Sequence, residues 1–116
     1  IQQVLQSAIG KVEAVYTPTD NMIAAGMATV ALVAEPAKLP VVCGEGGMTR
    51  LGGTATYGIS YYELGKLTST QAVSILKGEK NPAEMPIEYL QKFDLIVNTN
   101  MVESIGLTIP ESLYNQ

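Results

Sequence analysis

The amino-acid sequence predicts an α/β fold, a three-layer, doubly wound arrangement with helices on both faces of a mainly parallel sheet. Short apolar runs with β-branched residues, such as Val41-Val42-Cys43, alternate with longer stretches whose apolar residues recur at helical spacing. No internal repeat or low-complexity tract interrupts this alternation. The chain has 116 residues, which is enough for one compact domain and too few for two well-packed ones.

The first half of the chain predicts two helices and two strands. They are the end of a helix over residues 1–10, a strand over 12–16, a helix over 20–35 and a strand that begins at 41. Gly10 closes the first helix, and Pro18 stops the first strand. In the second helix, apolar residues follow i, i+3, i+4 spacing, and its small residues let it lie close to a sheet.

The second half predicts further strands and one well-signalled helix. After the Gly-rich residues 44–47, we expect a turn over 50–53, a strand over 54–59 and a helix over 60–77. A connector over 79–86 leads to an extended pair over 87–90 and 94–97. A short helix from 100 to 106 and a helical turn in 109–113 come last. Ser60 and Glu63 match a capping box, and Gly78 ends that helix. Asn100 and Glu103 repeat the same capping logic.

Composition excludes several classes of function. Charged residues make up 16% of the chain, against about 25% in a typical protein, and hydrophobic residues 47%, so we expect a large buried surface. A net charge of −4 gives no basic stripe for nucleic acid. The sequence has no His, and its one Cys, Cys43, follows two valines, which is typical of a buried residue. We therefore expect no catalytic residues, metal site or cofactor.

Polar residues that follow the predicted strands are candidate ligand contacts, because open parallel sheets bind ligands at the carboxyl ends of their strands. Thr19, Asp20 and Asn21 come between a strand and a helix, where they either bind a ligand or cap the helix. Glu45 follows the next strand and either pairs with a ligand ammonium group or remains a solvated side chain.

A cluster of tyrosines offers flat apolar faces with hydroxyl groups, which suit an organic ligand. Its members are Tyr57, Tyr61 and Tyr62, and we take Tyr57 and Tyr61 as the candidate contacts. At least one of the three is expected only to pack against the protein.

The order of these motifs resembles the C-terminal half of the ABC-importer substrate-binding proteins associated with aromatic amino acids. The resemblance is carried by Thr17-Pro18-Thr19-Asp20-Asn21, Val41-Val42-Cys43-Gly44-Glu45 and Tyr57-Gly58-Ile59-Ser60-Tyr61-Tyr62, and it spans essentially the whole chain. It implies a type I periplasmic-binding fold with two lobes that close on a ligand. It also implies that Asp20, Asn21, Glu45 and the Tyr57 region face the cleft.

The resemblance also implies a division of the chain between lobes. Residues 1–56 and 87–116 would belong to the C-terminal lobe, and residues 57–86 would cross over and supply a helix of the N-terminal lobe. The chain is then expected to be a fragment of a longer protein. Because the apolar face of the crossover helix would lack its sheet, we expect the fragment to self-associate, by domain swapping for example, or to refold that helix onto its own sheet.

The resemblance implies a non-catalytic, extracytoplasmic component of an ABC import system, either periplasmic or anchored to the cell surface as a lipoprotein. It would capture a small molecule, an aromatic amino acid by expectation, and deliver it to a permease. Two alternatives stay open at this point: a ligand-sensing domain of a transcription regulator or receptor, and a doubly wound enzyme, which share the fold.

Overall fold

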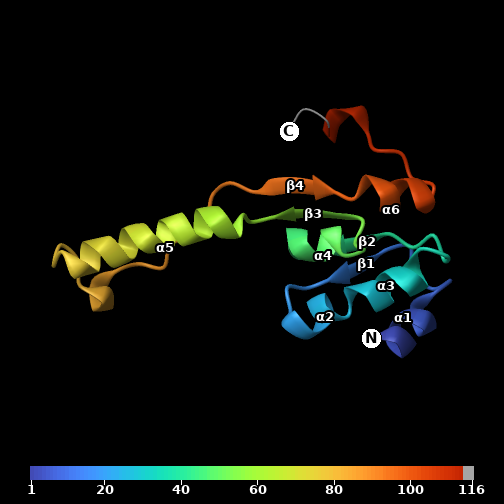
Figure 1. The fold of residues 1–116 in the computed structure, drawn as a ribbon, viewed down its shortest axis with the longest axis horizontal. Helices are drawn as coiled ribbons and strands as arrows, with labels where there is room; N and C mark the ends of the chain where they lie inside the picture. Colours follow the sequence, from blue (N-terminus) through green and yellow to red (C-terminus); the bar gives the residue numbers. More distant parts are fainter. Residues whose placement is uncertain (114–116) are drawn as a thin grey trace. The chain divides into compact units, whose positions relative to one another are not determined.

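The computed structural model describes residues 1–113 and divides them into two compact units (Figure 1). The first unit contains Ile1–Gly58 and the segment that begins at Leu95, and the second contains Ile59–Asp94. The predicted division at 57 and 87 assigns residues to lobes of a larger protein, and this assignment stays a prediction.

A four-stranded sheet forms the centre of the first unit. Its strands are β1 (Val15–Thr17), β2 (Val41–Cys43), β3 (Ala55–Gly58) and β4 (Asp94–Val97), in the order β1-β2-β3-β4. β1 and β2 are parallel, as are β2 and β3. β4 runs in the opposite direction, because the amide after its last residue, Asn98, donates to the carbonyl of Thr54 at the start of β3 (2.9 Å). The predicted α/β class with a mainly parallel sheet is confirmed.

The helices of the first unit are short. They are α1 (Gln2–Ala8), α2 (Asn21–Ala25), α3 (Met27–Ala34), α4 (Gly46–Arg50), α6 (Thr99–Ser104) and a 3-10 turn, η2 (Glu111–Leu113). α2 and α3 replace the single helix predicted over 20–35. The break falls at Gly26, where a Cβ would lie 2.6 Å from the Ile1 side chain, so the glycine lets α1 approach closely.

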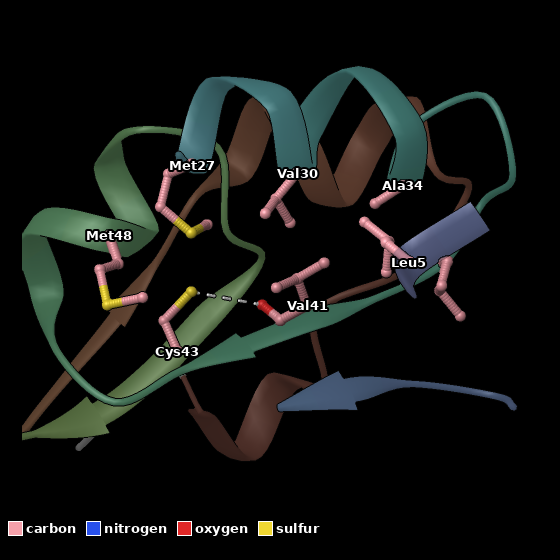
Figure 2. Close-up of a cluster of buried hydrophobic side chains, with 8 residues drawn as sticks. Leu5, Met27, Val30, Ala34, Val41, Cys43 and Met48 are labelled. Carbon is pink, nitrogen blue, oxygen red and sulfur yellow. Dashed lines mark hydrogen bonds between the residues drawn. The ribbon is translucent and has the colours of Figure 1, made fainter. Parts of the chain in front are cut away.

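One face of the sheet is covered by α3 and α4, and the core lies between them and β2 (Figure 2). The core cluster consists of Leu5, Met27, Val30, Ala34, Leu39, Val41, Cys43 and Met48. Because side chains alternate along a strand, Val41 and Cys43 enter this core while Val42 lies on the other face, 42% exposed. Tyr16 and Tyr57 share that second face and are also exposed.

The second unit is built on one long helix, α5 (Tyr61–Leu76), followed by a 3-10 turn, η1 (Pro82–Glu84). The Ser60 hydroxyl accepts a hydrogen bond from the Glu63 amide (3.4 Å), and Gly78 ends the helix at a φ of 73°. These are the predicted ends of this helix. None of the residues of α5 is buried.

Two predictions are wrong, and one helix was not predicted. Residues 87–90 form no strand. The helix α4 precedes the predicted turn over 50–53, and residues 51–52 of that turn do form one. The side chain that caps α6 is that of Asn98, not Asn100, and its Oδ1 accepts from the Met101 amide (3.2 Å). Asn98 also donates through Nδ2 to the Thr49 carbonyl (3.1 Å), which fixes it where β4 ends.

Candidate functional site

The loops that follow β1 and β2 meet the end of β3 at one edge of the sheet, as the parallel order requires. Two glycines show how closely they pack. A Cβ at Gly44 would lie 2.6 Å from Thr19 Oγ1 and 2.7 Å from the Thr19 amide nitrogen. A Cβ at Gly58 would lie 3.4 Å from the Gly44 carbonyl oxygen and 3.6 Å from the Cα of Glu45. These contacts join the first loop to the second, and the second to the end of β3.

Asp20 caps α2, which was one of the two expected uses of this residue. Its Oδ1 accepts hydrogen bonds from the amides of Met22 (2.8 Å) and Ile23 (3.0 Å), two donors that have no partner within the helix. Oδ2 accepts no hydrogen bond from the described residues, and the side chain is exposed. One oxygen therefore holds the helix while the other remains accessible to a ligand.

Glu45 caps α4 with both of its carboxylate oxygens. Oε2 accepts from the Gly47 amide (2.7 Å) and Oε1 from the Met48 amide (2.6 Å). The side chain is half-buried, so its position is held by these two bonds rather than left to solvent. Each carboxylate oxygen has a second lone pair, and the group can still accept from a ligand.

Neither carboxylate forms an ion pair with a cationic side chain of residues 1–113. Within residues 1–113, the only ion pair joins Lys66 to Glu63, in the second unit. Asp20 and Glu45 thus bring two negative charges to one edge of the sheet with only helix starts to stabilise them. This edge favours a ligand that carries a positive charge.

The remaining predicted site residues are placed in both units. Thr19 is exposed in the first loop, and Asn21 is exposed at the start of α2. Tyr57 lies near the end of β3 on the open face of the sheet, 64% exposed. Tyr61 begins α5 in the second unit and is exposed. The structure therefore brings together Thr19, Asp20, Asn21, Glu45 and the end of the Tyr57 strand within the first unit.

Sequence reasoning missed Thr56, whose Oγ1 and the Gly44 carbonyl oxygen both lie close to Gly58. Its side chain is 1% exposed, and Oγ1 has no hydrogen-bond partner among the described residues. A threonine inside a strand carries no sequence signal for such a position, because threonine is a common strand residue. Only the packing around it makes it unusual.

Two negative findings concern the described residues. No group of three His, Cys, Asp or Glu side chains converges as a metal site there. None of the helices there has the length and apolar character that would span a membrane. Cys43 is a buried free thiol whose Sγ lies 3.8 Å from the Val41 carbonyl oxygen, within the core.

Comparison with known proteins identifies a family and a curated relative. Residues 1–116 match the family model for ABC transporter substrate binding proteins. A tyrosine-binding protein of Clostridioides difficile (strain R20291) is 31% identical over 107 residues, which are 92% of this chain and 31% of that protein. The chain therefore spans about a third of the length of this curated relative.

Three solved structures are similar to this chain over nearly its whole length. A domain from Streptococcus pneumonia in complex with L-Trp matches 98% of this chain and 38% of that chain, with 32% identity and a TM-score of 0.86. A ligand-free, open substrate-binding protein with adhesive properties from Clostridium difficile matches 95% of this chain and 37% of its own chain, with 35% identity and a TM-score of 0.76. A conserved domain protein from Vibrio cholerae matches 97% of this chain and 38% of its own chain, with 29% identity and a TM-score of 0.85.

Proposed function

Because this chain belongs to the family of ABC transporter substrate-binding proteins, we propose that it is part of an extracytoplasmic receptor that captures an aromatic amino acid for import. In this proposal the chain supplies one wall of a cleft between two lobes. The first unit belongs to the C-terminal lobe, and the segment with α5 belongs to the N-terminal lobe. The receptor delivers its ligand to a permease and carries out no reaction on it.

The observation that carries this proposal is the pair of carboxylates at the edge of the sheet, neither of which forms an ion pair with a cationic side chain of residues 1–113. Amino acids carry an ammonium group, and a charge-assisted hydrogen bond from it to Asp20 or Glu45 would give that carboxylate a cationic partner. The hydroxyl of Thr19 and the amide of Asn21 flank Asp20 along the chain and can bind further polar atoms of the ligand.

The aromatic part of the proposal rests on the relatives and on the tyrosines. One relative is a tyrosine-binding protein, and one similar structure contains L-Trp. In this chain, Tyr57 and Tyr61 are exposed and offer aromatic faces to a ring. A ligand that combines an ammonium group with an aromatic side chain uses both features.

Calorimetric titration of the protein at its natural length tests this function. We expect heat of binding with L-tyrosine or L-tryptophan, and none with 3-(4-hydroxyphenyl)propanoate, which is tyrosine without the ammonium group. Absence of binding by every amino acid would refute the ligand class. Binding of the propanoate as tightly as of tyrosine would refute the role of the carboxylates.

Matched variants identify the carboxylate that meets the ammonium group. We expect Glu45→Gln or Asp20→Asn to weaken amino-acid binding by roughly tenfold or more, because a hydrogen bond to a charged group is lost. Glu103→Gln is the control, since Glu103 is an exposed carboxylate on α6 with no role in these loops. Equal affinities in all three variants would count against the assignment.

A further inference from the structure

The Thr56 hydroxyl is a buried polar group that the fold leaves without a partner. The residue is 1% exposed, and Oγ1 accepts and donates no hydrogen bond among the described residues. Burial of an unpaired hydroxyl destabilises a protein, so such groups are rare and often bind a water molecule. The core cluster on the same face of the sheet consists of apolar side chains (Figure 2).

Thr54 provides the contrast on the same strand side. It lies two residues earlier and therefore points to the same face as Thr56, and it is 5% exposed. Its Oγ1 accepts a hydrogen bond from the Val41 amide (2.9 Å). The fold thus gives the Thr54 hydroxyl, just before β3, a hydrogen-bond partner and leaves the Thr56 hydroxyl, inside β3, without one among the described residues.

Gly58 packs closely beside Thr56. A Cβ at Gly58 would lie 3.1 Å from Thr56 Oγ1 and 3.4 Å from the Gly44 carbonyl oxygen, so both oxygens line the region beside the Gly58 Cα. Both oxygens can accept a hydrogen bond, and a water molecule needs two to four such polar partners when it is buried. The next residue after Gly44 is Glu45, whose carboxylate caps α4.

We propose that Thr56 and the Gly44 carbonyl hold a buried water molecule at the base of the ligand site, and that this water supports the turn which presents Glu45 to the ligand. Thr56 is then a positioning residue that acts through the water and the Gly44-Glu45 turn. This inference rests on the proposed function for its effect on affinity, whereas the water itself is present with or without a ligand.

The decisive variant is Thr56→Val, which has nearly the same shape and lacks the hydroxyl. In the protein at its natural length, we expect it to weaken L-tyrosine or L-tryptophan binding by about three- to tenfold, the effect of one ordinary hydrogen bond. We expect its melting temperature to change little, because the lost hydrogen bond to the water is offset by the removal of a hydroxyl that is costly to bury. Thr56→Ser retains the hydroxyl and should bind the ligand nearly as well as the wild type.

Thr54→Val is the matched control. It leaves the Val41 amide without its acceptor, so it should lower the melting temperature while ligand affinity stays unchanged. Thr54→Val thus shows the effect of a purely structural hydroxyl, which changes stability and leaves affinity unchanged. Loss of affinity without loss of stability in Thr56→Val therefore separates positioning from packing.

Gly58→Ala and a crystal structure of the ligand-free protein supply independent evidence. The added methyl group occupies the space beside Thr56 Oγ1, so we expect it to displace the water and weaken binding as Thr56→Val does. The wild-type structure should contain a water within hydrogen-bonding distance of both Thr56 Oγ1 and the Gly44 oxygen.

The outcomes separate this inference from the proposed function. If the wild type binds an amino acid and Thr56→Val binds it equally well, the positioning role is overturned. If no water lies between the two oxygens in the crystal, the inference fails whether or not a ligand binds. If the water is present but no amino acid binds to the wild type, the proposed function and the positioning role both fail, and only the water site survives.

Discussion

At the scale of single residues, the candidate site is made of side chains that stabilise the fold and still have free lone pairs. Asp20 uses one oxygen for the helix and leaves the other accessible, and Glu45 uses both oxygens for amides in the first turn of α4. Such residues are positioned before a ligand arrives, which lowers the entropy cost of binding. Capping and binding are therefore compatible roles here, although the sequence presents them as alternatives.

Two substitutions at Asp20 separate these roles. Asp20→Ala removes the acceptor for the Met22 and Ile23 amides, and we expect it to lower the free energy of unfolding by about 1 kcal/mol. Asp20→Asn keeps a capping oxygen and should leave the stability nearly unchanged, because Asn caps helices as well as Asp does. Urea unfolding followed by circular dichroism measures both values. Equal destabilisation by the two variants would show that the charge, rather than the hydrogen bonds, stabilises α2.

At the scale of elements, helix ends follow local signals and helix interiors follow packing. Ser60 and Gly78 bound α5 where their chemistry predicts, because a cap and a left-handed glycine act on neighbouring backbone groups. The interruption at Gly26 depends on the approach of Ile1, which is distant in the sequence. The spacing of apolar residues over 20–35, taken alone, predicts one continuous helix.

Two glycine substitutions test this difference on α5. Gly78 has a φ of 73°, where an L-residue with a Cβ is strained, so Gly78→Ala should lower stability by roughly 1 kcal/mol. Gly65 lies inside the helix with nothing within 4 Å of an added Cβ, so Gly65→Ala should raise helix stability by about 1 kcal/mol. Thermal unfolding monitored at 222 nm compares them. A stabilising Gly78→Ala would contradict the assigned helix end.

At the scale of the whole molecule, much apolar surface is left uncovered. The open face of the sheet exposes Tyr16 and Val42, and a groove of about 350 Å³ beside β1 is lined mainly by apolar side chains. On α5, Val73 and Leu76 are 47% and 86% exposed. Exposed apolar surface of this extent is typical of regions that contact other protein.

We therefore expect the isolated 116-residue chain to self-associate. Replacement of Val73 and Leu76 by lysine should shift the chain toward a monomer, because the added charges oppose contact through the exposed face of α5. Multi-angle light scattering at several concentrations measures the mass. Substitution of Thr70 by lysine, at an exposed polar position of the same helix, is the control. A wild-type chain that is monomeric at every concentration would contradict the expectation.

The site was partly predictable from the sequence. The loops after β1 and β2 could be found because parallel strands place their carboxyl ends together, and this rule located Thr19, Asp20, Asn21 and Glu45. The helix α4 could not be found, since Gly-Glu-Gly-Gly has low helix propensity and is typical of a turn. Its formation depends on the two hydrogen bonds that Glu45 accepts from the amides of Gly47 and Met48.

The sequence by itself determined the α/β class, the order of the strands' apolar runs, the ends of α5 and the polar loops, because periodicity and caps act over a few residues. Only the tertiary structure decided that Thr56 is buried without a partner and that Glu45 is held at the start of a helix. It also decided which face of the sheet packs against the hydrophobic core. These properties depend on atoms brought together from distant parts of the chain, and no local pattern encodes such contacts.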